Sequence, residues 1–222
     1  MNLSLDVNSF RTRLETFHPD SYVRARALAL YSAAITLAED ALMTSAIRVS
    51  LRLDLTGSQL YEIVLQSYLF LGFPRMLIAA DCLNRACPDL KPPRTPLAVS
   101  ADEAAEWTDR GVDLCKRVYD KNYGLLKDRV ENMAPEIFRW MVFEGYGKVL
   151  SRPGLGIVER EMAIVACLIM ENRPSQLYSH MRGALNVGAD PLLVRAVVKD
   201  IGKSAGDGFR TAQKILDRLG VS

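Results

Sequence analysis

The residues of this chain best suited to proton transfer are His180 and Glu161. His180 is one of two histidines in the sequence, and imidazole is the side chain that most readily exchanges a proton near neutral pH. Glu161 lies nineteen positions earlier, and the segment 172–174 between them has the composition of a tight turn. Two antiparallel helices joined by this turn would set the carboxylate against the ring and orient it. We therefore expect an acid–base pair.

Each of these residues also has a structural interpretation, and the sequence leaves both open. His180 suits a helix face where its ring bonds to a nearby carbonyl, and Glu161 suits the first turn of a helix, where a negative charge favours the dipole. Arg152 suits a buried ion pair with an acid such as Glu144 or Glu131. These alternatives require no catalysis.

The elements that must position the pair are predicted to be helices. Apolar residues recur with helical spacing in nearly every segment, and the short β-branched runs that indicate strands are scarce. The sequence therefore predicts an all-α fold. The expected helices span 7–17, 20–37, 41–53, 57–71, 74–87, 101–121, 125–146, 156–171, 175–187, 191–202 and 206–219.

The clearest break in the chain is a proline-rich segment at 87–96. Four prolines fall within 88–96, and proline cannot continue a helix. This segment separates two halves, which we expect to form units of residues 1–96 and 97–222.

The two halves resemble each other when the chain is shifted by 134 positions. Residues 26–75 then align with 160–209 without a gap, with matching apolar positions and eight identities, among them Gly72 with Gly206. The turn at 54–57 falls on the turn at 188–191. We expect two repeated helical units that cover each other's apolar faces.

A resemblance to a known family rests on three segments of the second half. These are Gly145–Leu155 with its Arg-Pro-Gly-Leu sequence, Glu159–Glu161, and Asn172–Gly188 with its histidine. Together they resemble the γ-carboxymuconolactone decarboxylase family, within the wider alkylhydroperoxidase D-like group of helical proteins. The resemblance covers about Trp107 to Gly220, and it implies a helical bundle of that type built from two units.

Two departures from the family bear on chemistry. Peroxidase members carry a CxxC pair between the glutamate and the histidine, whereas the corresponding residues here are Arg173 and Gln176. Thiol peroxidase activity is therefore disfavoured, because nucleophile and resolving thiol are both missing. In addition, the offset of 134 places Glu161 on Ala27 and His180 on Ala46, so the first unit is degenerate.

The resemblance implies a cofactor-independent, decarboxylase-like lyase acting on a small carboxylated compound such as a carboxylated lactone. In that interpretation His180 and Glu161 are catalytic, and Arg173, Arg152 and Gln176 contact the substrate, with an arginine holding its carboxylate. The alternative is a non-catalytic helical binding or assembly module that has lost an ancestral activity.

Composition and charge indicate which partners and which cellular location to expect. The 222 residues carry 28 basic and 26 acidic side chains without a long basic run, which disfavours nucleic-acid binding. No uninterrupted apolar stretch has the length of a membrane span, and the first residues do not resemble a signal peptide, so the default expectation is a cytoplasmic protein without membrane contact.

The remaining expectations concern metals, assembly and the second histidine. The four cysteines form no CxxC pair and the chain has only two histidines, so no metal site is predicted, and the family resemblance implies that no cofactor is needed. Relatives assemble as trimers or hexamers, and the resemblance therefore implies a homo-oligomer, with a trimer favoured and a dimer second.

His18, before Pro19, is interpreted as part of a turn that begins a helix.

Overall fold

Helices make up the regular structure of the chain in its computed structural model. The structure describes residues 12–13 and 22–221, and this part contains no β-strand. The prediction of an all-α fold is confirmed. In chain order the elements are α2 (Val23–Leu37), α3 (Asp40–Arg52), α4 (Gly57–Ala86), α5 (Ala101–Tyr119), η1 (Asp120–Asn122), α6 (Tyr123–Met133), α7 (Pro135–Trp140), the π-helix η2 (Met141–Leu150), α8 (Ile157–Met170), α9 (Pro174–Asn186), α10 (Pro191–Ile201), η3 (Gly202–Ala205) and α11 (Asp207–Leu219).

The predicted helix at 125–146 is wrong in one respect, because the chain breaks inside it. Ala134 is extended, with φ −164° and ψ 98°, and Pro135 begins the next helix. A residue before proline is disfavoured in the α region, which explains the break. The predicted helix at 7–17 falls almost entirely outside the described residues, as does the predicted turn at His18.

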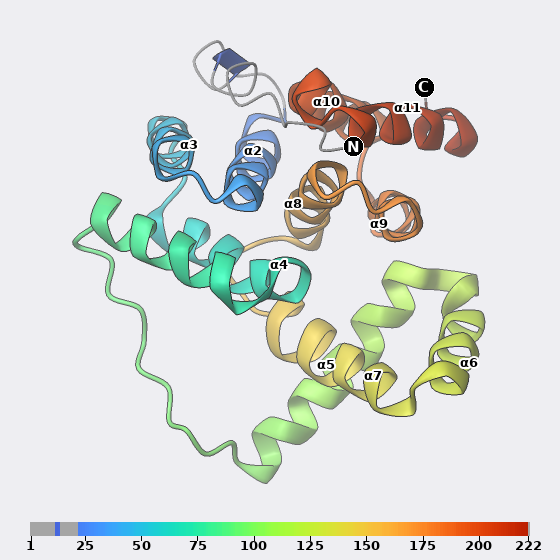
Figure 1. The fold of residues 1–222 in the computed structure, drawn as a ribbon. Helices are drawn as coiled ribbons and strands as arrows, with labels where there is room; N and C mark the ends of the chain where they lie inside the picture. The colour runs from blue at the N-terminus through green and yellow to red at the C-terminus, as the bar shows by residue number, and fades with distance from the viewer. Residues whose placement is uncertain (1–11, 14–21, 222) are drawn as a thin grey trace.

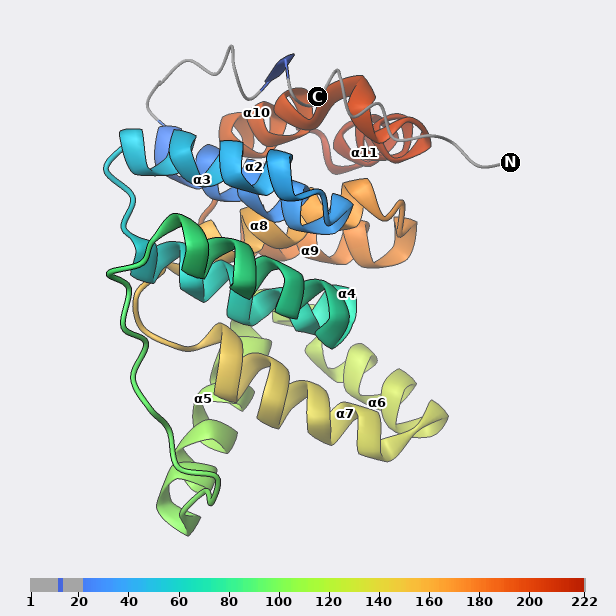
Figure 2. The ribbon, with the colours of Figure 1, turned by 60° about the vertical axis from the view of Figure 1, so that its left-hand side comes forward.

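Helix α4 has the length and apolar composition of a membrane-spanning helix, the one element of the described chain that does. It is not continuous, because Gly72 has φ 75° and ψ 169°. Figure 2 shows its two parts doubling back on each other. Each part is shorter than the roughly 20 residues needed to cross a bilayer, so α4 is better described as a helical hairpin.

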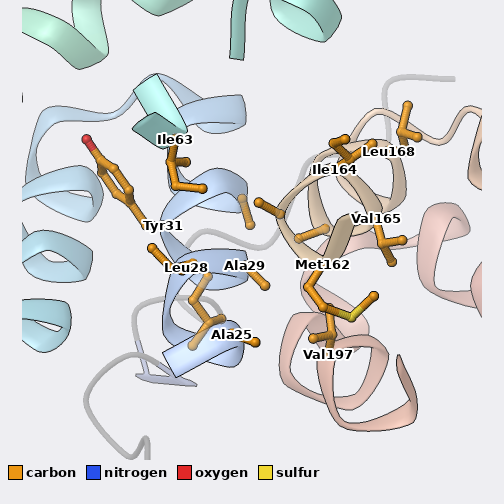
Figure 3. Packing of buried hydrophobic residues seen from close by; sticks show 14 of the residues in the cluster. Ala25, Leu28, Ala29, Tyr31, Ile63, Met162, Ile164, Val165, Leu168 and Val197 are labelled. Atoms are coloured by element: carbon orange, nitrogen blue, oxygen red, sulfur yellow. The ribbon is translucent and has the colours of Figure 1, made fainter. Parts of the chain in front are cut away.

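The centre of the fold is the contact between α2 of the first half and α8 of the second (Figure 1). Figure 3 shows the side chains of this contact, with Ala29 of α2 facing Met162 of α8. Ser32 donates a hydrogen bond to the carbonyl oxygen of Ala163 at 2.7 Å. A single hydrophobic cluster contains residues of both halves, so the halves share one core.

Unusual backbone conformations recur in the two halves at the offset of 134. Positive φ angles occur at Ala38 (55°) and Asn172 (49°), and at Asp54 (60°) and Gly188 (96°). Gly72 and Gly206 form a third such pair, at 75° and 54°. The helix N-caps recur as well, because Thr56 caps α4 and Asp190 caps α10 through their side chains. Turns therefore fall at corresponding places in 23–86 and 157–219.

Two arginines make reciprocal contacts across the centre. Arg26 of α2 donates to both carboxylate oxygens of Asp200 in α10, at 2.6 and 2.8 Å. Arg160 of α8 donates to Oε1 of Gln66 in α4 at 3.3 Å. The two pairs are related by the offset of 134, so α2 and α8 each reach the other half of the chain from corresponding positions. Such reciprocal contacts are typical of an interface between two units that are related by a two-fold axis.

The site region also depends on α5, which crosses η2 at very short range. A Cβ atom added to Gly111 would lie 2.2 Å from the carbonyl oxygen of Val142, and one added to Gly147 would lie 2.0 Å from that of Trp107. Only glycine allows this approach. The crossing holds the end of α5 against α9, where Val118 contacts Gly183.

Candidate functional site

The structure brings His180 and Glu161 together in the interior. Nδ1 of His180 lies 2.9 Å from Oε2 of Glu161, within hydrogen-bond distance. Glu161 has no exposed surface, and His180 is 7% exposed. When the ring is neutral, a hydrogen on Nδ1 donates to the carboxylate and leaves the lone pair on Nε2. The geometry therefore fixes which nitrogen is free to accept a proton.

The local sequence explains why these two side chains meet. Helix α8 ends at Met170, and Asn172 adopts a left-handed conformation that reverses the chain. Pro174 then occupies the first position of α9, where its fixed φ suits a helix start. The two helices consequently lie side by side, which places Glu161 of α8 opposite His180 of α9.

The free nitrogen of His180 has no hydrogen-bond partner in the part of the chain that the structure describes. Nε2 is not fully enclosed either, so some of its surface is accessible. The ring of Phe70, from the first part of α4, lies edge-on to the imidazole with ring centroids 5.5 Å apart. Nε2 is therefore the atom of the pair that meets solvent or a small molecule, beside an aromatic wall.

The second carboxylate oxygen of Glu161 is enclosed and unsatisfied. Oε1 has no accessible surface and no hydrogen-bond partner among the described residues. A buried carboxyl oxygen without a partner carries a desolvation cost.

Two tyrosines, Tyr119 of α5 and Tyr146 of η2, form the next layer behind Glu161. Burial raises the pKa of Tyr119 to about 12, with a smaller opposing effect of its hydrogen bond with Tyr146. The pKa of Tyr146 is raised well above its usual range by burial and by the nearby Tyr119 and Glu161. The hydrogen bond between them lowers the pKa of Tyr119 and raises that of Tyr146. Both phenols stay neutral at physiological pH.

None of the three residues predicted to contact a substrate forms a hydrogen bond or ion pair with His180 or Glu161 in the part of the chain that the structure describes. Arg152 binds Glu62 through Nε and Nη2, at 3.0 to 3.2 Å, which is a different partner from the two acids expected. Arg173 is exposed and pairs with Glu171 at 3.4 Å. Gln176 is exposed in the first turn of α9, one turn before His180. Their roles in substrate binding stay predictions.

The cysteines take no part in the pair. Cys82, Cys115 and Cys167 are buried, and Cys87 is partly buried. Burial raises the pKa of Cys115 and of Cys167 to about 12, so both are thiols rather than thiolates at neutral pH. Among the described residues no group of three or more histidine, cysteine or acidic side chains is arranged to hold a metal ion.

Sequence reasoning found the central pair but missed Phe70, Tyr119 and Tyr146. These residues come from α4, α5 and η2, which lie far from α8 and α9 along the chain. One signal was available for Tyr146, since it lies between Gly145 and Gly147 in the segment that carried the family resemblance. Phe70 and Tyr119 offered no comparable signal.

Comparisons with known proteins give two relatives. A protein of Schizosaccharomyces pombe named "Peroxisomal protein 2" is 28% identical over 163 residues, which cover 68% of this chain and 72% of that protein. A protein of the same name from Saccharomyces cerevisiae is 24% identical over 160 residues, covering 61% of this chain and 56% of that protein. No family model matches the chain.

These relatives correct two predictions made from the sequence. Both carry a name that refers to the peroxisome, and neither is named as a lyase or a decarboxylase. The prediction of a decarboxylase-like lyase acting on a carboxylated lactone is therefore wrong, as is that of a cytoplasmic location. The inference failed because the matching residues define a pair of helices and an acid–base couple, and these do not specify a reaction.

Proposed function

We propose that this chain is a peroxisomal protein in which His180 and Glu161 transfer protons to and from a small molecule. The names of both relatives support the compartment. One observation carries the chemistry: an enclosed carboxylate oxygen lies 2.9 Å from Nδ1 of a histidine whose Nε2 has no partner in the described chain.

The proposed chemistry follows from the two ring nitrogens of His180 and the carboxylate of Glu161. Glu161 accepts the hydrogen of Nδ1 and so holds the ring with its Nε2 lone pair outward. Nε2 then takes a proton from a bound molecule, and the carboxylate stabilises the imidazolium that forms. Returning the proton to another atom of the molecule completes a transfer without a cofactor. Phe70 limits the approach to molecules that tolerate an aromatic edge.

Exchange of carbon-bound hydrogen for deuterium tests this proposal across many candidate substrates at once. The protein is incubated in heavy water with a panel of small carbonyl compounds and acyl thioesters, and incorporation is followed by mass spectrometry. We expect the wild type to accelerate exchange of at least one compound. His180→Gln, which removes the base while keeping a polar side chain, should lower the acceleration by about 100-fold or more.

The matched control is a glutamate on the same helix that does not touch the ring. Glu159 caps the start of α8 by accepting from the backbone N–H of Gly156 at 2.9 Å, so Glu159→Gln should leave the exchange rate unchanged. Glu161→Leu, like His180→Gln, should lower the exchange rate. Equal exchange in wild type and His180→Gln across the panel would exclude the proposed role.

We propose further that the chain has the architecture of the alkylhydroperoxidase D-like group, with its unit present twice. The support is the recurrence at an offset of 134 of three left-handed positions, one capped helix start and one reciprocal arginine contact. An experimental structure in which 23–86 does not superpose on 157–219 would disprove the duplication.

We propose a homo-oligomer, with a trimer favoured over a dimer. Large apolar side chains are exposed on the second part of α4, where Phe73 is 60% and Leu77 is 61% exposed, and Ile137 and Trp140 are exposed on α7. A second copy of the chain would cover such surface. Light scattering should give a mass above that of one 24.7 kDa chain, and Leu77→Lys should lower it. A monomeric wild type would disprove the assembly.

A further inference from the structure

A small cavity lies between the end of α5, η1 and α9. Its volume is about 130 Å³. Its polar lining includes one arginine, two amides and three hydroxyl groups, and no acidic side chain contributes to it. The residues concerned are Arg182, Asn122, Asn186, Ser179, Tyr119 and Tyr178. A cavity of this composition carries positive charge and offers hydrogen-bond donors.

Arg182 is the charged member, and its positive charge is not neutralised within the described chain. No carboxylate among the described residues lies within ion-pair distance of its guanidinium, and no hydrogen bond from it occurs there. By contrast, the more deeply buried Arg160 binds Glu62. A partly buried guanidinium that faces a polar cavity without an acid is suited to bind an anion.

The rest of the lining supplies fixed donors. The Tyr119 hydroxyl lines the cavity, and its raised pKa of about 12, caused chiefly by burial, keeps it protonated and so able to donate a hydrogen bond. Asn122 makes no hydrogen bond through its side chain within the described part, so its amide is available too. Asn186 donates to the carbonyl oxygen of Val118 at 2.8 Å, which ties α9 to the end of α5 and holds the cavity open.

A second cation contacts one of the lining residues. The guanidinium of Arg218 lies over the ring of Tyr178, 4.4 Å from its centroid. Stacking on an aromatic ring does not neutralise the charge of Arg218.

We propose that this cavity binds one oxyanion group, a carboxylate or a phosphate, with Arg182 as its principal ligand and Asn122 and Tyr119 as further donors. The volume admits a single group of that size, so any larger ligand extends outward to solvent. The site is separate from the His180 pair and its binding does not depend on the proposed proton transfer. Tyr119 nevertheless joins the two, because it lines the cavity and is hydrogen-bonded to Tyr146, and both tyrosines lie near Glu161.

The chain contains its own control for this proposal. The offset of 134 places Arg48 of α3 on Arg182 of α9, and both are arginines. Arg48 is exposed and lines none of the described cavities. Arg182→Met therefore removes a positive charge beside the cavity, and Arg48→Met removes the same charge from the equivalent helix position, which has no cavity beside it.

The experiment is a titration with inorganic phosphate and, separately, with acetate, followed by backbone amide chemical shifts. Chemical shifts locate the bound anion, whereas a thermal shift would also report the general stabilising effect of phosphate. We expect saturable changes at Ser179 and Asn122 in the wild type and in Arg48→Met. Arg182→Met should weaken the affinity about tenfold or more, because it removes charge-assisted hydrogen bonds.

The outcomes distinguish a phosphate group from a carboxylate, and they show which results would overturn the proposal. Saturation by phosphate with no response to acetate assigns a phosphate group, and saturation by acetate assigns a carboxylate. Arg182→Lys, which keeps the charge but loses the two-pronged guanidinium, should bind with intermediate affinity. An absence of saturable change with both anions, or equal affinity in Arg182→Met and wild type, would overturn the site. Neither result depends on hydrogen exchange at His180, so the two proposals fail independently.

Discussion

The guanidinium of Arg160 donates to Oε2 of Glu62 at 2.8 Å, and this contact joins the two halves of the chain in the interior. Arg160 has no exposed surface, and Glu62 is 6% exposed. The same carboxylate also binds Arg152, so one acid compensates two guanidinium groups. Glu62 is therefore the buried charge in the contact between α4 and α8, beside the hydrogen bonds that Gln66 makes with Arg160.

Removing that charge should destabilise the fold strongly. Glu62→Gln leaves Arg160 buried beside a neutral amide, and breaking a buried ion pair from one side typically lowers the free energy of unfolding by about 3–5 kcal/mol. Urea unfolding followed by circular dichroism measures the change. Glu106→Gln is the control, because the Glu106 side chain is 61% exposed and loss of its ion pair with Arg110 should change the stability little. Similar values for the two variants would contradict the assignment.

A second prediction concerns two glycines of the same π-helix, η2. Gly147→Ala should lower the free energy of unfolding by about 1–3 kcal/mol or more, because the new Cβ would lie 2.0 Å from the carbonyl oxygen of Trp107 and force α5 away. Gly145→Ala meets no atom within 4 Å and should be neutral or stabilising. Thermal unfolding of the two variants tests the crossing. If Gly145→Ala proved the more damaging, the described approach of α5 to η2 would be wrong.

The buried thiols should react slowly and with a marked pH dependence. Burial raises the pKa of Cys115 and Cys167 to about 12, so at pH 8 only about one thiol in ten thousand is the reactive thiolate. Alkylation should therefore accelerate as pH rises toward 12, and Cys87, which is partly buried, should be modified first. Iodoacetamide labelling of the native protein, with peptides quantified by mass spectrometry, measures the order. Modification of Cys115 as fast as Cys87 at pH 8 would refute it.

The sequence predicted what depends on neighbouring residues and failed where distant segments meet. The turn at Asn172–Pro174 is local, and once it reverses the chain the contact between Glu161 and His180 follows from helix geometry. The partner of Arg152 is Glu62, ninety positions away, and no local pattern identifies it. Phe70 reaches His180 only because α4 folds back at Gly72, and helical periodicity does not specify where a hairpin lies in space.

The final prediction concerns the hydrogen on the ring of His180. In a His18→Gln background, where His180 is the one remaining histidine of the chain, nitrogen chemical shifts of the neutral ring should show the hydrogen on Nδ1, since Glu161 accepts there. Glu161→Leu removes that acceptor while filling a similar volume, and the hydrogen should then populate Nε2 to a much greater extent. Glu159→Leu serves as the control, because Glu159 binds the backbone of Gly156 instead of the ring. An unchanged tautomer in Glu161→Leu would show that the carboxylate does not orient the imidazole, and the proposed proton transfer would lose its physical basis.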